Sequence, residues 1–182
     1  MKFRVLSILF IILSNFLSRA QNFISNSGKI KFTSEAPLEL IKAESGKTVC
    51  VISAADKKFA FKVEINSFEG FNSPLQKEHF RENYMESEKF KYATFTGKII
   101  EDIDLTKPGT YNVRAKGNMI IHGVEKEKII KAKMIVKEGN CEIDSSFDVP
   151  LADHNIKIPK VVNQKIASVI SVDFKANLIV KK

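Results

Sequence analysis

The stretch YNVRAKGNMII, residues 111–121, alternates between two kinds of side chain. Its odd positions are apolar or small, and its even positions as far as Asn118 are polar or charged. Because successive side chains of a β-strand point to opposite faces, this stretch predicts a strand with one buried face and one solvated face.

The same alternation recurs through most of the chain. It is clear in residues 59–65, 130–137, 141–149 and 166–180, and shorter strands are expected at 29–34, 38–42, 48–53 and 94–101. Breaks are expected at residues 44–46, 55–57, 107–109 and 138–140. About eight or nine half-buried strands at this spacing predict an all-β fold, either a sandwich or a closed barrel.

One segment departs from the period of two. Ser73, Pro74 and Gln76 have the spacing of a helix N-cap, a first helical position and the third residue after the cap. A short helix is therefore expected to run to about Met85. A lone helix between strands is expected to cover an open end or seam of the β-structure, and gating a cavity is the alternative role.

The first twenty residues have the layout of a secretory signal peptide. Lys2 and Arg4 precede an apolar run at residues 5–13, and small residues surround a cleavage point after Ala20. The alternative, a membrane anchor, is disfavoured because the run is short for a hydrocarbon layer of ~30 Å. The sequence thus predicts a periplasmic or secreted protein whose single domain spans residues 21–182.

The charge pattern bears on the class of partner. The formal net charge is +8, but the lysines are scattered through the predicted strands. Nucleic-acid binding normally requires a clustered basic face, so no nucleic-acid partner is expected. A solvated lysine-rich exterior is the preferred interpretation, and weak attraction to an anionic membrane surface stays open.

The residues that usually carry catalysis do not form a recognisable centre. His79, His122 and His154 lie far apart without the short ligand spacing of a metal site, and no G-x-S-x-G motif occurs. Neither an enzyme activity nor a cofactor is predicted. Cys50 and Cys141 either form a disulfide or remain two separate buried thiols, and the sequence leaves both alternatives open.

The predicted inward faces mix large apolar residues with small ones. An eight-stranded barrel can either fill its interior with side chains or hold one small ligand, and both outcomes agree with the alternation. Rows of small residues would leave room for a ligand. The small inward residues are Ala115, Gly117, Ala132, Ser145 and Ala176.

Three segments resemble the YceI-like family. They are residues 68–95, which contain the predicted helix and an Ala-Thr-Phe strand, the hairpin GNMIIHGVEK at 117–126, and VPLADHNI at 149–156. The resemblance covers about Gly28 to Leu178. Many members open with a His-Ser-containing strand, which GKIKFTS at 28–34 lacks, so the chain resembles a divergent, shorter subgroup.

The resemblance implies an antiparallel, lipocalin-like barrel of about eight strands in the bacterial periplasm that holds a long polyisoprenoid chain. We therefore expect an exported lipid-binding protein, with a homodimer as a further possibility. The alternative is a filled barrel that serves as a structural or interaction protein of the cell envelope. The residues expected to contact the ligand are Phe61, Val63, Phe95, Tyr111, Val113, Met119, Met134, Phe147, Ile170 and Phe174, with Phe80 and Tyr84 closing one end from the helix.

Overall fold

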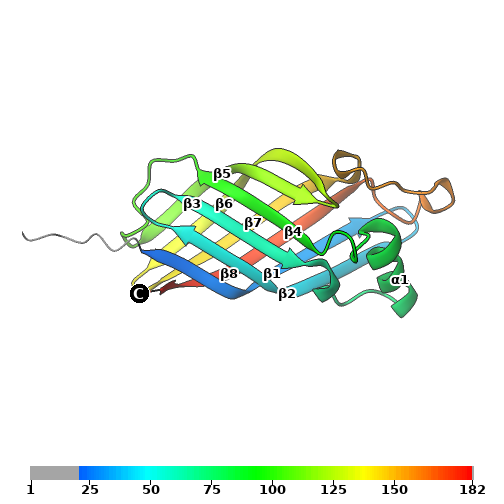
Figure 1. Ribbon diagram of the computed structural model, residues 1–182, viewed down its shortest axis with the longest axis horizontal. Coiled ribbons are helices and arrows are strands. Elements are labelled where there is room, and N and C mark those ends of the chain that lie inside the picture. Colours follow the sequence, from blue (N-terminus) through cyan, green and yellow to red (C-terminus); the bar gives the residue numbers. More distant parts are fainter. Residues whose placement is uncertain (1–20, 182) are drawn as a thin grey trace, which may run out of the picture.

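The computed structural model describes residues 21–181, and the predicted signal peptide at 1–20 lies outside them. Within the described chain, eight antiparallel strands close into a barrel in sequence order, and the last pairs with the first (Figure 1). The all-β barrel prediction is therefore confirmed. The strands are β1 (Asn22–Glu35), β2 (Leu40–Ser53), β3 (Lys58–Glu64), β4 (Tyr92–Ile99), β5 (Gly109–Ile121), β6 (Val124–Lys137), β7 (Asn140–Pro150) and β8 (Val169–Lys181).

The helical segments gather at one end of the barrel. The predicted helix is present as α1 (Pro74–His79), which continues as a π-helical turn, η2 (Phe80–Tyr84). Its start is fixed as expected, because the Ser73 hydroxyl accepts a hydrogen bond of 3.1 Å from the Gln76 backbone N–H. The short 3₁₀ turns η1 (Ile65–Ser67), η3 (Leu151–His154) and η4 (Lys160–Val162) lie at the same end, which we call the helix end (Figure 1).

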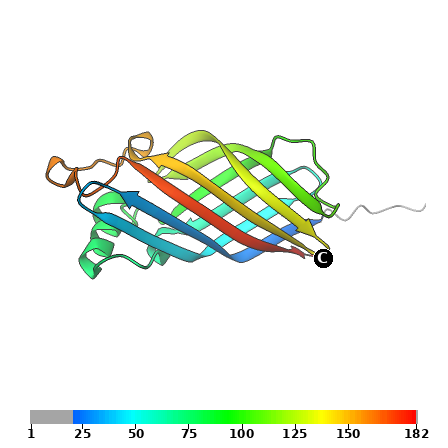
Figure 2. The same cartoon turned by 180° about the vertical axis from the view of Figure 1, so that it is seen from behind.

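The start of the first strand and the end of the last strand lie at the other end of the barrel. β1 begins and β8 ends at the end of the barrel opposite α1, as both views of the ribbon show (Figures 1 and 2). No helix formed by residues 21–181 has both the length and the apolar character needed to cross a lipid bilayer.

Two expected boundaries are wrong. Residues 44–46 do not break the chain, because β2 runs through them with a shift in its pairing to β1: Ile30 lies opposite Ser45, whereas Gly28 lies opposite Thr48. Such a bulge absorbs extra residues and bends a strand without ending it. The last strand also begins at Val169 and not at residue 166.

The barrel interior follows the predicted alternation. On β5, Val113 and Met119 are buried whereas Asn112 and Arg114 are exposed. The two cysteines, Cys50 and Cys141, are both free and buried in the main core, so of the two alternatives the separate thiols are observed. Burial raises the pKa of each thiol to about 12.

Candidate functional site

A cavity of about 440 Å³ occupies the helix end of the barrel. Its sides are the inward residues at the strand ends, and α1 and η2 lie over it. The wall is mainly apolar, which is typical of sites for small apolar molecules. The strands contribute Ile30, Phe32, Ile41, Val63, Ala93, Ile121, Val149, Ile170 and Val172, and the connecting segments contribute Ile65, Phe68, Phe71, Leu75, Tyr84, Met85, Leu151, Ile156, Val162 and Ile166.

Four phenylalanines form an aromatic cluster between α1 and the barrel. The ring of Phe80 stacks on Phe32 with 5.3 Å between centroids, and it packs against Phe71 at 5.1 Å and Phe68 at 5.8 Å. Phe80 was predicted from the sequence, but Phe32, Phe68 and Phe71 were not. Alternation within residues 29–34 places Phe32 on the inward face, so that one position could have been found from the sequence.

Polar groups of the wall come from the segments that border the opening. The Gln76 side-chain amide donates a 2.8 Å hydrogen bond to the Glu39 carboxylate, which ties α1 to the start of β2. The buried Ser34 hydroxyl accepts a hydrogen bond of 2.9 Å from the Ala167 backbone N–H, which ties β1 to the segment before β8. His79 and Lys165 also belong to the wall and are exposed. The polar groups of the wall are therefore grouped near the opening, whereas the deeper wall is apolar.

The structure divides the predicted site residues into three groups by their depth in the barrel. Val63, Phe80, Tyr84 and Ile170 line the cavity. Five others belong to the main core: Phe61, Phe95, Met119, Phe147 and Phe174. On its own strand, each is the inward residue next to one that lines the cavity, and it lies on the side away from the helix end.

The third group lies deeper, with no part in the cavity. Val113 and Met134 are buried in the main core. The Tyr111 hydroxyl lies within hydrogen-bond distance of two backbone carbonyls near the far end, 3.0 Å from that of Lys107 and 3.3 Å from that of Asp104. The interior is thus hollow at the helix end and filled by side chains beyond it.

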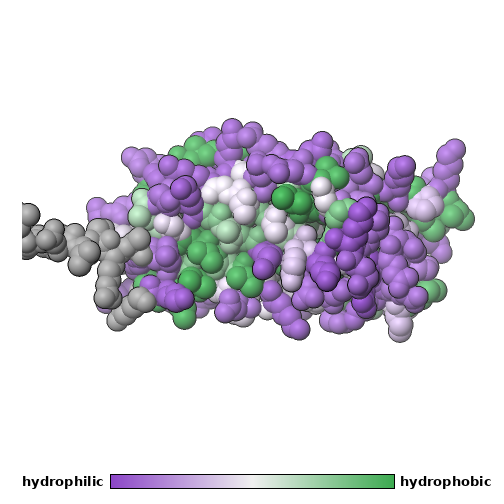
Figure 3. All heavy atoms as spheres, viewed as in Figure 1, coloured by the Kyte–Doolittle hydropathy of each residue, from purple (hydrophilic) through white to green (hydrophobic). Residues whose placement is uncertain are grey.

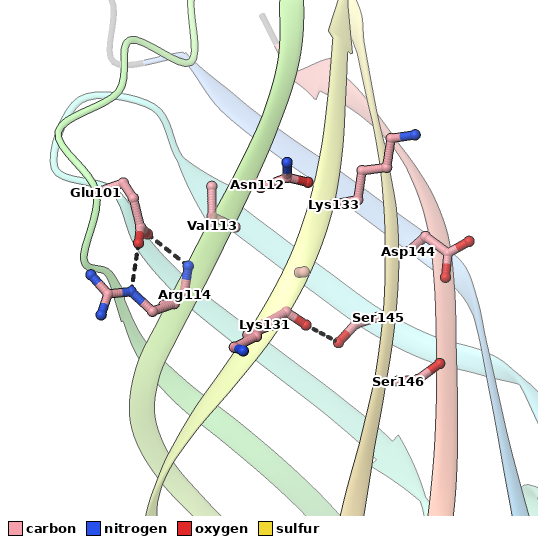
Figure 4. A pocket seen from close by; sticks show the side chains of 10 residues that line it. Glu101, Asn112, Val113, Arg114, Lys131, Lys133, Asp144, Ser145 and Ser146 are labelled. Carbon is pink, nitrogen blue, oxygen red and sulfur yellow. Dashed lines mark hydrogen bonds and ion pairs between the residues drawn. The ribbon is translucent and has the colours of Figure 1, made fainter.

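A second hollow, of about 590 Å³, lies on the outer side of β5, β6 and β7 (Figure 4). Several of its polar groups already have partners. The Glu101 carboxylate accepts hydrogen bonds from the Arg114 backbone N–H at 2.6 Å and from its Nε at 2.8 Å, and these bonds lower the pKa of Glu101. The Ser145 hydroxyl donates a 2.7 Å hydrogen bond to the Lys131 carbonyl. This bond lies just beyond Lys133 and Asp144, the last residues that pair between β6 and β7. This arrangement suits a structural role better than ligand binding.

The histidines connect loops at the helix end. His122 Nε2 lies 2.8 Å from Glu86 Oε1, and His122 Nδ1 lies 3.1 Å from the carbonyl oxygen of His154. His154 in turn donates from Nδ1 to the Val124 carbonyl at 3.1 Å. Residues 21–181 contain no group of three His, Cys, Asp or Glu side chains arranged to hold a metal ion.

Comparison with known proteins finds one matching family and several solved structures with a similar fold. A family model described as a YceI-like domain matches residues 19–178. A polyisoprenoid-binding domain from Saccharophagus degradans superposes with a TM-score of 0.73 at 13% identity, covering 90% of this chain and 100% of its own.

Two further solved structures have the same fold. BcnA of Burkholderia cenocepacia gives a TM-score of 0.67 at 13% identity and covers 82% of this chain and 95% of its own. The YceI protein of Campylobacter jejuni gives 0.57 at 13% identity and covers 100% of this chain and 91% of its own. No curated protein sequence matches the chain.

Proposed function

The chain belongs to the family of YceI-like domains, and from this membership and its cavity we propose that it is an exported lipid-binding protein holding an isoprenoid-like apolar chain. The similar domain from Saccharophagus degradans is described as polyisoprenoid-binding, which supports the ligand class. The layout of residues 1–20 supports export to the periplasm or beyond.

The observation that carries the proposal is the apolar cavity at the helix end. Each methylene group transferred from water into such a wall contributes ~0.8 kcal/mol, so an apolar chain can bind tightly without a charged contact. The polar groups at the opening suit the hydrated end of an amphipathic lipid. The protein is therefore proposed to bind and shield its ligand, with no chemical step.

The surface around the opening suits an exchange of lipid with a membrane. Leu38, Leu75 and Val161 are exposed there, Val161 to 88%, and Lys160 and Lys165 lie beside them. Hydrophobic residues are visible at this end in the space-filling view beside hydrophilic ones, and others lie over the middle of the same face (Figure 3). Exposed apolar side chains beside lysines favour peripheral contact with an anionic lipid surface, at about 1 kcal/mol per lysine.

The first test is to extract protein purified from its own host with organic solvent and to identify the copurified lipid by mass spectrometry. The variant Ala93→Phe adds a ring inside the cavity and is expected to reduce the lipid recovered per protein at least fivefold. Ala60→Phe makes the same change at an exposed residue on the outer face of β3 and is the matched control.

The alternative function predicts a different result. If neither the native protein nor the Ala60→Phe control carries any lipid, and added isoprenoid alcohols do not bind, the lipid-binding proposal is wrong. The protein would then be an envelope interaction module whose cavity has no ligand.

A further inference from the structure

We propose that a layer of large side chains across the barrel limits the buried part of the ligand to about three isoprene units. We call this layer the floor: Phe61, Phe95, Met119, Phe147 and Phe174. The inference rests on the proposed lipid-binding function and deepens it, because it identifies the residues that determine chain-length specificity.

The position of the floor follows from the strand pattern. Val63, Ala93, Ile121, Val149 and Val172 line the cavity on β3, β4, β5, β7 and β8. Two residues farther from the helix end, the same inward faces carry the floor residues. Phe61 pairs with Phe95, and Phe95 pairs with Met119, so these three side chains lie side by side on adjacent strands.

Two rings of the floor meet across the interior. Phe61 stacks on Phe174 with 5.3 Å between centroids, although β3 and β8 are separated in the barrel by β2 and β1. Phe59, the next inward residue on β3, stacks on Phe61 at 5.4 Å and packs against Phe95 at 4.8 Å. A chain entering from the helix end would therefore meet two tiers of aromatic rings.

Strands β1 and β2, which lie between β3 and β8, make room for these rings. In the bulged region of β1 and β2, the buried residues are small: Ser25, Gly28, Ser45 and Thr48. A Cβ atom added at Gly28 would lie 2.9 Å from Cys50 Sγ and 3.1 Å from the Thr48 carbonyl oxygen, so this region is closely packed. The small residues thus accommodate aromatic side chains and leave no continuation of the cavity.

The volume sets the length. A water molecule occupies about 30 Å³ of liquid and a methylene group is similar in size, so the cavity of about 440 Å³ holds about fifteen carbon atoms. Fifteen carbons make three isoprene units. A longer chain would leave its remainder outside the opening, where it gains no contact with the wall.

The test is a series of prenyl alcohols supplied from cyclodextrin and measured by calorimetry. Geraniol, farnesol, geranylgeraniol and solanesol contain two, three, four and nine isoprene units. We expect the affinity to rise at least tenfold from geraniol to farnesol, because five more carbons become buried, and to change less than threefold beyond farnesol.

Variants of the floor sharpen the test. Phe61→Ala, or separately Phe174→Ala, is expected to move the limit, so that geranylgeraniol binds at least fivefold more tightly than farnesol. Phe23→Ala removes the same side chain at the far end of the barrel, where Phe23 is buried opposite Ile52, and is expected to keep the limit at farnesol. If the alanine variants do not fold, Val172→Phe raises the floor and is expected to move the limit down to geraniol.

The outcomes separate this inference from the proposed function. An affinity that rises through solanesol in the native protein, or a limit unchanged in the floor variants, would overturn the floor and leave lipid binding intact. If none of the four alcohols binds and the purified protein carries no lipid, both the proposed function and this inference are wrong.

Discussion

His154 shows how one buried side chain supports the cavity. It is fully buried, it donates from Nδ1 to the Val124 carbonyl, and its Nε2 has no hydrogen-bond partner. It ends the turn that carries Leu151 and precedes Ile156, and both of these line the cavity. Burial lowers the pKa of His154, because the charged form loses its hydration there.

This lowered pKa predicts a fall in stability under mildly acidic conditions. The unfolded state takes up a proton near its ordinary pKa of about 6.5, while the folded state takes it up only at lower pH. The free energy of unfolding is therefore expected to decrease as the pH falls below about 7. His154→Asn should flatten this dependence in urea titrations, whereas His79→Gln, at an exposed histidine, should not. Equal slopes in the native protein and His154→Asn would contradict the assignment.

At the scale of single elements, the pairing of β4 with β5 depends on a close approach of two glycines. Gly97 lies opposite Gly117, and a Cβ atom built at Gly117 would lie 2.2 Å from the Thr96 carbonyl oxygen. A backbone atom cannot move aside as the end of a side chain can, so the two strands would have to separate.

Gly117→Ala is accordingly expected to lower the free energy of unfolding by about 3 kcal/mol, within the range of severe single substitutions. Gly46→Ala is the matched control, because no atom lies within 4 Å of its added Cβ. The control is expected to change stability by less than about 0.5 kcal/mol. Chemical denaturation measures both, and a similar small effect for both variants would contradict the close approach.

The elements also show what the sequence can predict. Alternation and helix-capping patterns are both local, so alternation correctly assigned inward residues such as Val113 and Met119, and the capping pattern correctly assigned the helix start at Ser73. Whether an inward residue borders a hollow depends on its level along the barrel, which the register between strands sets. Val63 and Phe61 share a face, yet only Val63 lines the cavity. The bulge in β2 was missed because Ser45 and Gly46 are also typical of a turn.

At the scale of the whole molecule, the barrel has a hollow part and a filled part. The filled part contains most of the main core, including Met134 and Leu178, and needs no ligand to exclude water. The hollow part exposes apolar wall to water whenever it is unoccupied. A bound apolar chain should therefore stabilise the fold as a whole, since it binds the native state and not the unfolded one.

Saturation with farnesol at a hundred times its dissociation constant is expected to add about 2.7 kcal/mol to the free energy of unfolding. For a domain of this size, that corresponds to a rise in Tm of roughly 8 °C. Differential scanning calorimetry of the native protein and of Ala93→Phe measures the effect, and the variant should show less than a third of it. An equal rise in both proteins would place the ligand outside the cavity.

The placement of the chain ends has a practical consequence. Because β1 begins and β8 ends at the end of the barrel opposite α1, a partner fused at either end joins the barrel a full strand length from the opening. A fluorescent reporter or a solid support attached there would leave the opening of the cavity unobstructed, so ligand binding can be measured on the immobilised protein.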